Sequence, residues 1–179
     1  MNQLNLEIKA RCADPEGTRQ LLISCGAQFR GKDHQIDTYF CVSTGRLKLR
    51  QGGIENALIF YERADEPGPK ASHAVVHETG IDTAGLKDIL IRTLGVLVVV
   101  EKERDIYFLG NVKFHIDQVK GLGSFVEIEV MNQNGAFDQP ALLAQCLAHL
   151  TYLGISRQDL ISRSYSDLLL EPVSSQARI

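Results

Sequence analysis

The chain has 179 residues, of which 44% are hydrophobic and 23% are charged. This balance argues against intrinsic disorder and is typical of one soluble domain with a packed core. The formal net charge of −3 argues against a nucleic-acid-binding protein, which would carry an excess of basic residues. No apolar run is long enough to cross a membrane, no signal region begins the chain and the four cysteines are scattered. These features predict a cytoplasmic protein.

The first half of the chain is predicted to contain one strand, one helix and then a run of strands. Residues 4–11 alternate apolar and polar side chains, as a strand does. Asp14 and Pro15 are a helix cap and a first-turn proline, and Gly26 ends that helix,. The segments that then read as strands, with a loop over 65–72 before the last, are 34–42, 46–51, 56–64 and 73–78.

The second half is predicted to be a helix, three strands and two further helices. The helices are 83–95, 138–153 and 156–170, and the strands are 96–109, 112–119 and 124–131. Because tight turns join the strands, the strands are antiparallel, and the long hairpin over 96–119 favours a barrel over a small open sheet. We expect one α+β domain over residues 1–171 and a flexible tail over 172–179.

On six of these strands the charged side chains share one face. They are Glu7 and Lys9; Arg46, Lys48 and Arg50; Arg63, beside Tyr61; Lys102 and Arg104; Lys113, His115 and Asp117; and Glu127 and Glu129. If helices cover the apolar faces and the sheet closes, every charged face points into one lumen. A metal-bound polyphosphate would satisfy such a lumen, because Lys and Arg pair with phosphate oxygens and carboxylates hold the metal. The alternative is an open sheet with a solvated charged face, which any single strand taken alone favours.

The carboxylates include candidates for metal binding. Glu127 and Glu129 stand two residues apart on one strand, so both point the same way and could hold an octahedral ion such as Mg²⁺. Glu7 is a third candidate ligand from the first strand. Asp117 could orient a lysine or a water molecule, whereas His115 is as consistent with a structural hydrogen bond as with a ligand or a base.

The basic residues repeat the same two-residue spacing. Lys48 with Arg50, and Lys102 with Arg104, place pairs of cations on two different strands. Arginine binds phosphate through a bidentate fork and lysine acts as a point charge. Two such pairs favour a ligand with several phosphates over a monophosphate.

In this order, the motifs resemble those of the CYTH superfamily, also called triphosphate tunnel metalloenzymes. Its members include class IV adenylyl cyclases, thiamine triphosphatases and inorganic triphosphatases. The first-strand motif Glu-x-Glu-x-Lys is similar to residues 5–9, where Glu7 and Lys9 match and Asn5 stands in the first position. The other similar segments are the basic strand at 46–50, the Lys-x-Arg strand at 101–107, the acidic strand with its preceding turn at 115–129, and the C-terminal Arg-Ser-Tyr at 163–165.

The resemblance implies an eight-stranded antiparallel β-barrel, or tunnel, with flanking helices, and Mg²⁺ or Mn²⁺ as the cofactor. It implies metal binding by Glu7, Glu127 and Glu129. The residues that it assigns to triphosphate binding are Lys9, Lys48, Arg50, Arg63, Lys102 and Arg104, with Lys113 and Arg163 as further basic candidates. Lys9 and Asp117 are the candidate catalytic residues. Asn5 departs from the motif and removes a strong ligand, so we expect altered metal demand or reduced turnover.

Two reactions fit these residues. One is hydrolysis of tripolyphosphate, thiamine triphosphate or a nucleoside triphosphate. The other is cyclisation of ATP to cyclic AMP and pyrophosphate, and the motif layout resembles the bacterial cyclase-like branch more closely. The alternative is a non-catalytic polyphosphate or nucleotide sensor. We therefore expect a triphosphate-containing small molecule as the ligand and no nucleic-acid or membrane partner, and the resemblance suggests a homodimer.

Overall fold

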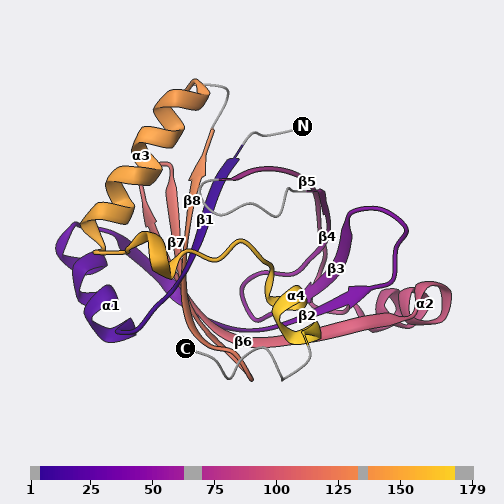
Figure 1. Cartoon of the computed structure of the whole chain (residues 1–179). Coiled ribbons are helices and arrows are strands. Elements are labelled where there is room, and N and C mark those ends of the chain that lie inside the picture. The colour runs from indigo at the N-terminus through magenta and orange to yellow at the C-terminus, as the bar shows by residue number, and fades with distance from the viewer. Residues whose placement is uncertain (1–4, 63–69, 133–136, 172–179) are drawn as a thin grey trace.

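The computed structural model describes residues 5–62, 70–132 and 137–171. Within them, eight antiparallel strands close into a barrel in the order β1-β5-β4-β3-β2-β6-β7-β8 (Figure 1). The predicted fold class is thereby confirmed. The strands are β1 Asn5–Arg11, β2 Gln28–Phe40, β3 Arg46–Gln51, β4 Ala57–Glu62, β5 Lys70–Glu78, β6 Val96–Leu109, β7 Val112–Val119 and β8 Gly123–Met131.

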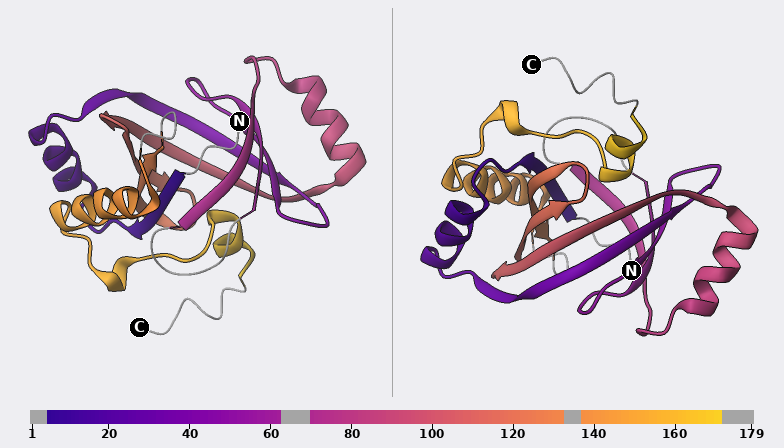
Figure 2. Two further views of the ribbon diagram at one scale, coloured as in Figure 1. Left: turned by 90° about the horizontal axis from the view of Figure 1, so that it is seen from above. Right: turned by 90° about the horizontal axis from the view of Figure 1, so that it is seen from below.

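The helices flank this barrel. They are α1 Pro15–Ser24, α2 Ala84–Leu94, α3 Gln139–Tyr152, the short 3₁₀ helix Arg157–Asp159, and α4 Tyr165–Leu170. Helices α1 and α3 lie at one end of the long strands β2 and β6, and α2 lies at the other end (Figure 2). No helix in the described part of the chain is long and apolar enough to span a membrane.

Strand β1 closes the barrel, because it pairs with β5 on one side and with β8 on the other. Its apolar residues Leu6, Ile8 and Ala10 are buried in a core that α3 also lines. Since successive side chains of a strand point to opposite faces, Glu7 and Lys9 face the lumen. Packing of the apolar face against helices therefore directs the charged face inward.

The structure corrects three predicted boundaries. Strand β2 begins at Gln28, six positions before the predicted start, because its first residues pair with the end of β6 across a register shift between Phe29 and Gly31. Strand β5 begins at Lys70, inside the predicted loop. Only the two ends of the helix predicted over 156–170 are helical. Between them the amide of Ile161 donates to the carbonyl of Lys9 at 2.8 Å, so pairing with β1 interrupts the helix.

Candidate functional site

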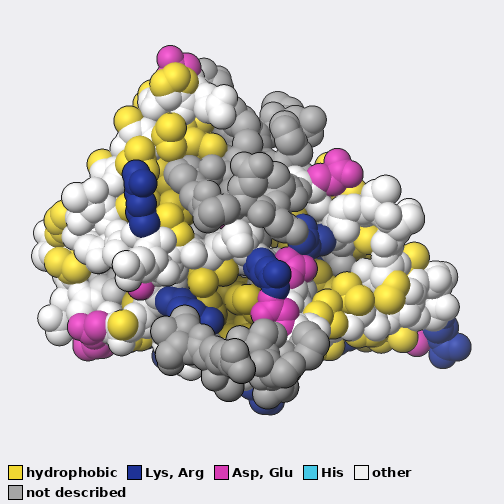
Figure 3. All heavy atoms as spheres, in the orientation of Figure 1, with side chains coloured by type: hydrophobic (Ala, Val, Ile, Leu, Met, Phe, Trp, Pro, Cys, Tyr) yellow, Lys and Arg dark blue, Asp and Glu magenta, His cyan; other side chains and the backbone are white. Residues whose placement is uncertain are grey.

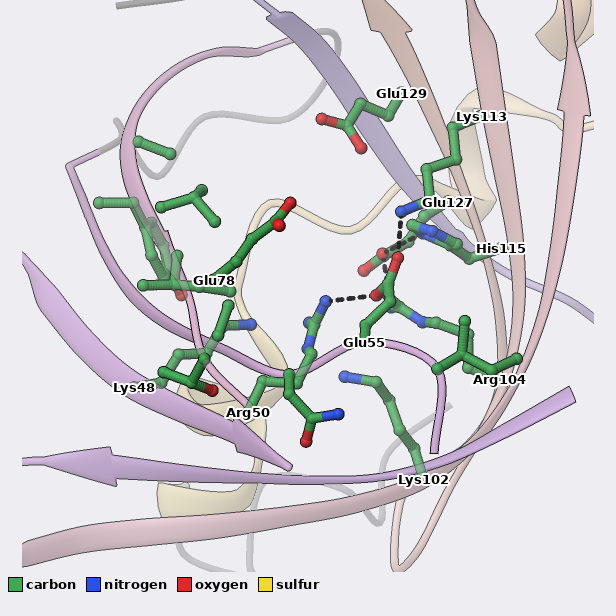
Figure 4. Close-up of a pocket in the computed structure, with 18 of the residues that line it drawn as sticks. Lys48, Arg50, Glu55, Glu78, Lys102, Arg104, Lys113, His115, Glu127 and Glu129 are labelled. Atoms are coloured by element: carbon green, nitrogen blue, oxygen red, sulfur yellow. Dashed lines mark hydrogen bonds and ion pairs between the residues drawn. The ribbon is translucent and has the colours of Figure 1, made fainter. Parts of the chain in front are cut away.

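A cavity of about 870 Å³ occupies the lumen, and all eight strands contribute to its wall. On one face of the molecule, basic and acidic side chains surround an apolar hollow (Figure 3), and Figure 4 shows the charged side chains converging inside. The predicted site residues that line the cavity are Glu7, Lys9, Lys48, Arg50, Lys102, Arg104, Lys113, Glu127 and Glu129.

The other predicted residues lie elsewhere. Asp117 is buried, 1% exposed, and does not belong to the cavity lining. Arg163 does not belong to the cavity lining; its half-exposed side chain pairs with Glu171. Arg63 and the side chain of Asn5 lie outside the described residues.

Asp37, which the sequence reasoning missed, holds three of the basic residues together. Its carboxylate accepts hydrogen bonds from Lys48 Nζ at 2.9 Å, Lys102 Nζ at 2.8 Å and Arg50 Nε at 2.9 Å. Burial opposes the ionised form, but Arg50, Lys102 and Lys48 hold the pKa of Asp37 well below its ordinary value. The Asp37 carboxylate is therefore shared by three basic side chains on β3 and β6.

This crowding changes the protonation of Lys102. Burial lowers the pKa of its ammonium group to about 7; Asp37 opposes the shift, and Arg104, Arg50 and Lys48 add to it. The Tyr165 ring on α4 packs 5.8 Å from Lys102 Nζ. A bound anion would therefore favour the protonated, positively charged form of Lys102.

A second buried group is built on Arg104. Its guanidinium donates to Asp117 Oδ1 at 2.7 Å and to Glu127 Oε2 at 2.7 Å, and it is 3% exposed. Asp117 also accepts from the Tyr165 hydroxyl at 2.8 Å. Burial raises the pKa of Tyr165 well above its ordinary value, and Asp117 adds to this shift, so the hydroxyl stays protonated and can donate. Asp117 therefore fixes the orientation of Arg104 and Tyr165.

Lys9 and His115 contact the same Glu127. Lys9 Nζ lies 2.9 Å from Glu127 Oε1, and His115 Nδ1 lies 3.2 Å from Oε2. Burial lowers the pKa of His115 to about 4, and nearby Arg104 adds to the shift, so the imidazole is neutral near neutral pH and donates through Nδ1. Its buried Nε2 has no hydrogen-bond partner among the described residues. Both Glu127 oxygens are engaged, and this residue acts as a counter-ion.

Glu7 and Glu129 lie directly opposite each other on β1 and β8. Opposed residues of an antiparallel pair have Cβ atoms about 4.5–5.5 Å apart on one face, and like charges there repel. Lys113 is the neighbour of Glu129 on β7. Within residues 5–62, 70–132 and 137–171, no group of three or more His, Cys, Asp or Glu side chains is arranged to hold a metal ion. The pair instead fits the way Mg²⁺ binds, through one or two carboxylates with substrate phosphates and water.

The remaining wall, on β4 and β5, is largely apolar. Ile59 and Tyr61 lie opposite Val76 and Ala74 in the β4–β5 register, and all four line the cavity. Tyr39 extends this surface, with its hydroxyl 3.4 Å from that of Tyr61. The lumen therefore combines a basic side, an acidic pair and an apolar wall, which suits a metal-bound triphosphate that carries an organic group.

Comparison with known proteins agrees with this geometry. The CYTH domain family model matches residues 3–165. Adenylate cyclase CyaB of Aeromonas hydrophila is 35% identical over 180 residues, covering 93% of this chain and 88% of that protein. Among solved structures, the PH1012 protein of Pyrococcus horikoshii has a TM-score of 0.78 at 26% identity, covering 92% of this chain and 98% of that one. The RNA triphosphatase Pct1 of Schizosaccharomyces pombe shares the fold, with a TM-score of 0.52 at 8% identity over 88% of this chain and 84% of that one.

Proposed function

This chain belongs to the CYTH domain family, and we propose that it is an enzyme that converts ATP to cyclic AMP and pyrophosphate with Mg²⁺ or Mn²⁺. Enzymes of the family are adenylate cyclases or triphosphatases and depend on a metal ion. The observation that carries the proposal is the separation of the charged part of the lumen from its apolar wall. Inorganic tripolyphosphate would leave that wall uncovered, whereas the nucleoside of ATP would cover it.

The basic side of the lumen is the proposed triphosphate site. Lys48, Arg50 and Lys102 contact the carboxylate of Asp37, and Arg50 also contacts Glu55; phosphate oxygens are further acceptors for these basic side chains. Lys9 and Arg104 extend this surface toward Glu127. These cations would stabilise the charge that develops as the bond to pyrophosphate breaks and the ribose 3′-oxygen bonds to the α-phosphorus.

Glu7 and Glu129 are the proposed metal ligands. A divalent ion there would relieve the repulsion between the two carboxylates and neutralise phosphate charge when bound. For Glu127 we propose the role of a counter-ion, since Lys9, Arg104 and His115 contact its oxygens. In place of the predicted catalytic role for Asp117, we propose a positioning role, since it is not part of the cavity lining and contacts Arg104 and Tyr165, which are.

A product assay tests the proposed reaction. Purified protein is offered ATP and tripolyphosphate in parallel with Mg²⁺ or Mn²⁺, and cyclic AMP, pyrophosphate and orthophosphate are quantified. We expect cyclic AMP and pyrophosphate in equal amounts, and a strong loss of both in Lys48→Met, which leaves Asp37 compensated by Arg50 and Lys102. Orthophosphate without cyclic AMP would assign the protein to triphosphate hydrolysis. Binding of ATP without any product would indicate a nucleotide sensor.

Binding of a triphosphate is also expected to take up a proton at Lys102. Near pH 8 this residue is largely neutral in the free protein, because its pKa is about 7, and a bound polyanion favours the charged form, so the uptake approaches about one proton. The same linkage makes binding tighten as the pH falls from about 9 to 7. Calorimetric titration of tripolyphosphate in buffers of different ionisation enthalpy measures the uptake.

Lys102→Arg is the control for this measurement. Arginine keeps the positive charge and does not titrate in this range, so the proton uptake should disappear while binding persists. Equal uptake in Lys102→Arg and in the wild-type protein would contradict the assignment to Lys102.

A further inference from the structure

One carboxylate in the lumen belongs neither to a strand nor to the proposed metal pair. Glu55 lies between β3 and β4, and its side chain reaches into the cavity (Figure 4). Its Oε2 accepts from Arg50 at 2.9 Å and from Gln35 at 3.0 Å, and its Oε1 accepts from Lys113. Arg50 is on β3 and Lys113 is on β7, strands that are not neighbours in the barrel. Glu55 therefore bridges two cations across the lumen.

The segment that carries Glu55 is held in one conformation. Asp33 accepts hydrogen bonds from three consecutive backbone amides, those of Gly53 at 2.6 Å, Ile54 at 2.9 Å and Glu55 at 3.1 Å. Asp33 itself is buried. A Cβ atom at Gly52 would lie 2.6 Å from Asp33 Oδ2, so the tight turn needs glycine there. The hydrogen bonds from the loop to Asp33 thus fix the position from which the Glu55 carboxylate contacts Arg50 and Lys113.

The surroundings of this carboxylate resemble those of a bound phosphate group. It accepts from one guanidinium and one ammonium group, the donors that bind phosphate oxygens. Burial opposes its ionised form, but Arg50, Lys113 and Arg104 hold the pKa of Glu55 below its ordinary value. Both of the cations that it contacts line the cavity. A triphosphate that used Arg50 and Lys113 would have to displace Glu55.

We propose that Glu55 occupies the position of one phosphate group in the ligand-free protein and sets the affinity of the site for triphosphates. This inference rests on the proposed function, since it concerns the same lumen. To displace Glu55, a ligand must gain binding free energy from the other basic residues, Lys9, Lys48 and Lys102, that exceeds the free energy lost when the contacts of Glu55 break. A long polyanion reaches all of these basic residues. Orthophosphate only replaces the Glu55 carboxylate with a phosphate group that makes similar contacts, so it gains little binding free energy.

The test compares two variants that each remove one negative charge from the cavity. Glu55→Gln removes the charge that Arg50 and Lys113 contact and preserves the size of the side chain. Glu78→Gln removes the charge of a carboxylate that also lines the cavity but is exposed. Inorganic tripolyphosphate is titrated into each protein by calorimetry, with Mg²⁺ and with EDTA, after thermal denaturation has shown that the variants are folded.

We expect Glu55→Gln to bind tripolyphosphate about tenfold more tightly than the wild-type protein, the equivalent of one charge-assisted hydrogen bond that no longer needs to be broken. Glu78→Gln should change the affinity by at most about twofold, because an exposed charge is screened by solvent and salt. Equal or weaker binding by Glu55→Gln, with the wild-type protein binding normally, overturns the inference and leaves the proposed function intact. Failure of all three proteins to bind with or without Mg²⁺ overturns both.

Discussion

Replacing Arg104 with Met is expected to lower the free energy of unfolding at neutral pH by about 3–5 kcal/mol, because it removes one partner of a buried ion pair. Arg104 and Asp117 are 3% and 1% exposed, and Arg104 contacts both Asp117 and Glu127. Without the guanidinium, Asp117 still accepts the hydrogen bond from the Tyr165 hydroxyl, and Glu127 still contacts Lys9 and His115. The uncompensated charge therefore falls mainly on Asp117. Denaturant unfolding measures the loss.

The pH dependence of this loss identifies its cause. In the wild-type protein burial raises the pKa of Asp117, but Arg104 outweighs burial and the net shift is downward; its contribution to stability is present above the unfolded pKa and is lost as the pH falls through the folded pKa. In Arg104→Met burial is no longer outweighed and raises that pKa, so the folded protein takes up a proton and the deficit shrinks as the pH falls from neutral toward the ordinary range of an aspartate. A deficit that stays constant over this range would contradict the electrostatic explanation.

An exposed ion pair provides the matched control. Arg92 donates to Asp88 one helical turn earlier at 2.8 Å, and the two side chains are 76% and 60% exposed. Such pairs stabilise a protein by about 0.3–0.5 kcal/mol, so Arg92→Met should be nearly neutral. The double variant of Arg104→Met with Asp117→Asn should recover about half of the lost stability, since it removes the stranded charge.

Alternation along the strands predicted which face of each strand carries the charged side chains, whereas closure into a barrel was predicted from the long hairpin over 96–119 and from the resemblance to the CYTH superfamily. Alternation failed where pairing between distant segments decides the structure. Residues 28–30 at the start of β2 are exposed and carry no alternating apolar signal, and only their pairing with β6 makes them a strand. The helix predicted over 156–170 is interrupted by the hydrogen bond between Ile161 and Lys9, a contact that local periodicity cannot predict.

The site was predictable to the extent that its residues lie on strands. Lys48 with Arg50 and Lys102 with Arg104 were singled out by their two-residue spacing, and all four line the cavity, while their role in triphosphate binding stays a prediction. Asp37 was missed although it alternates with Gln35 and Tyr39, a polar face that could have indicated an inward position. Glu55 follows no periodicity because it lies in a loop. Its role depends on hydrogen bonds from the loop to Asp33, which the sequence does not reveal.

Glu129→Gln is expected to reduce metal-dependent turnover by at least about 100-fold, which corresponds to about 2.7 kcal/mol of lost transition-state stabilisation. Glu129 lies opposite Glu7 across the β1–β8 pair, so an amide at this position removes half of the proposed ligand pair. It also removes the repulsion between the two carboxylates, and denaturant unfolding checks that the variant is folded. Activity is measured as a function of Mg²⁺ and Mn²⁺ concentration, and a higher metal concentration should partly restore it.

Glu127→Gln separates metal binding from charge compensation on the same strand. Lys9, Arg104 and His115 contact Glu127, so its amide variant should lose about 3 kcal/mol of stability while the metal concentration needed for half-maximal activity stays close to the wild-type value. The opposite pattern, in which Glu127→Gln raises the metal requirement and Glu129→Gln does not, would assign the metal to Glu127. A metal requirement for Glu129→Gln that stays at the wild-type value would exclude Glu129 as a ligand, because its loss must weaken the binding of any ion that it holds.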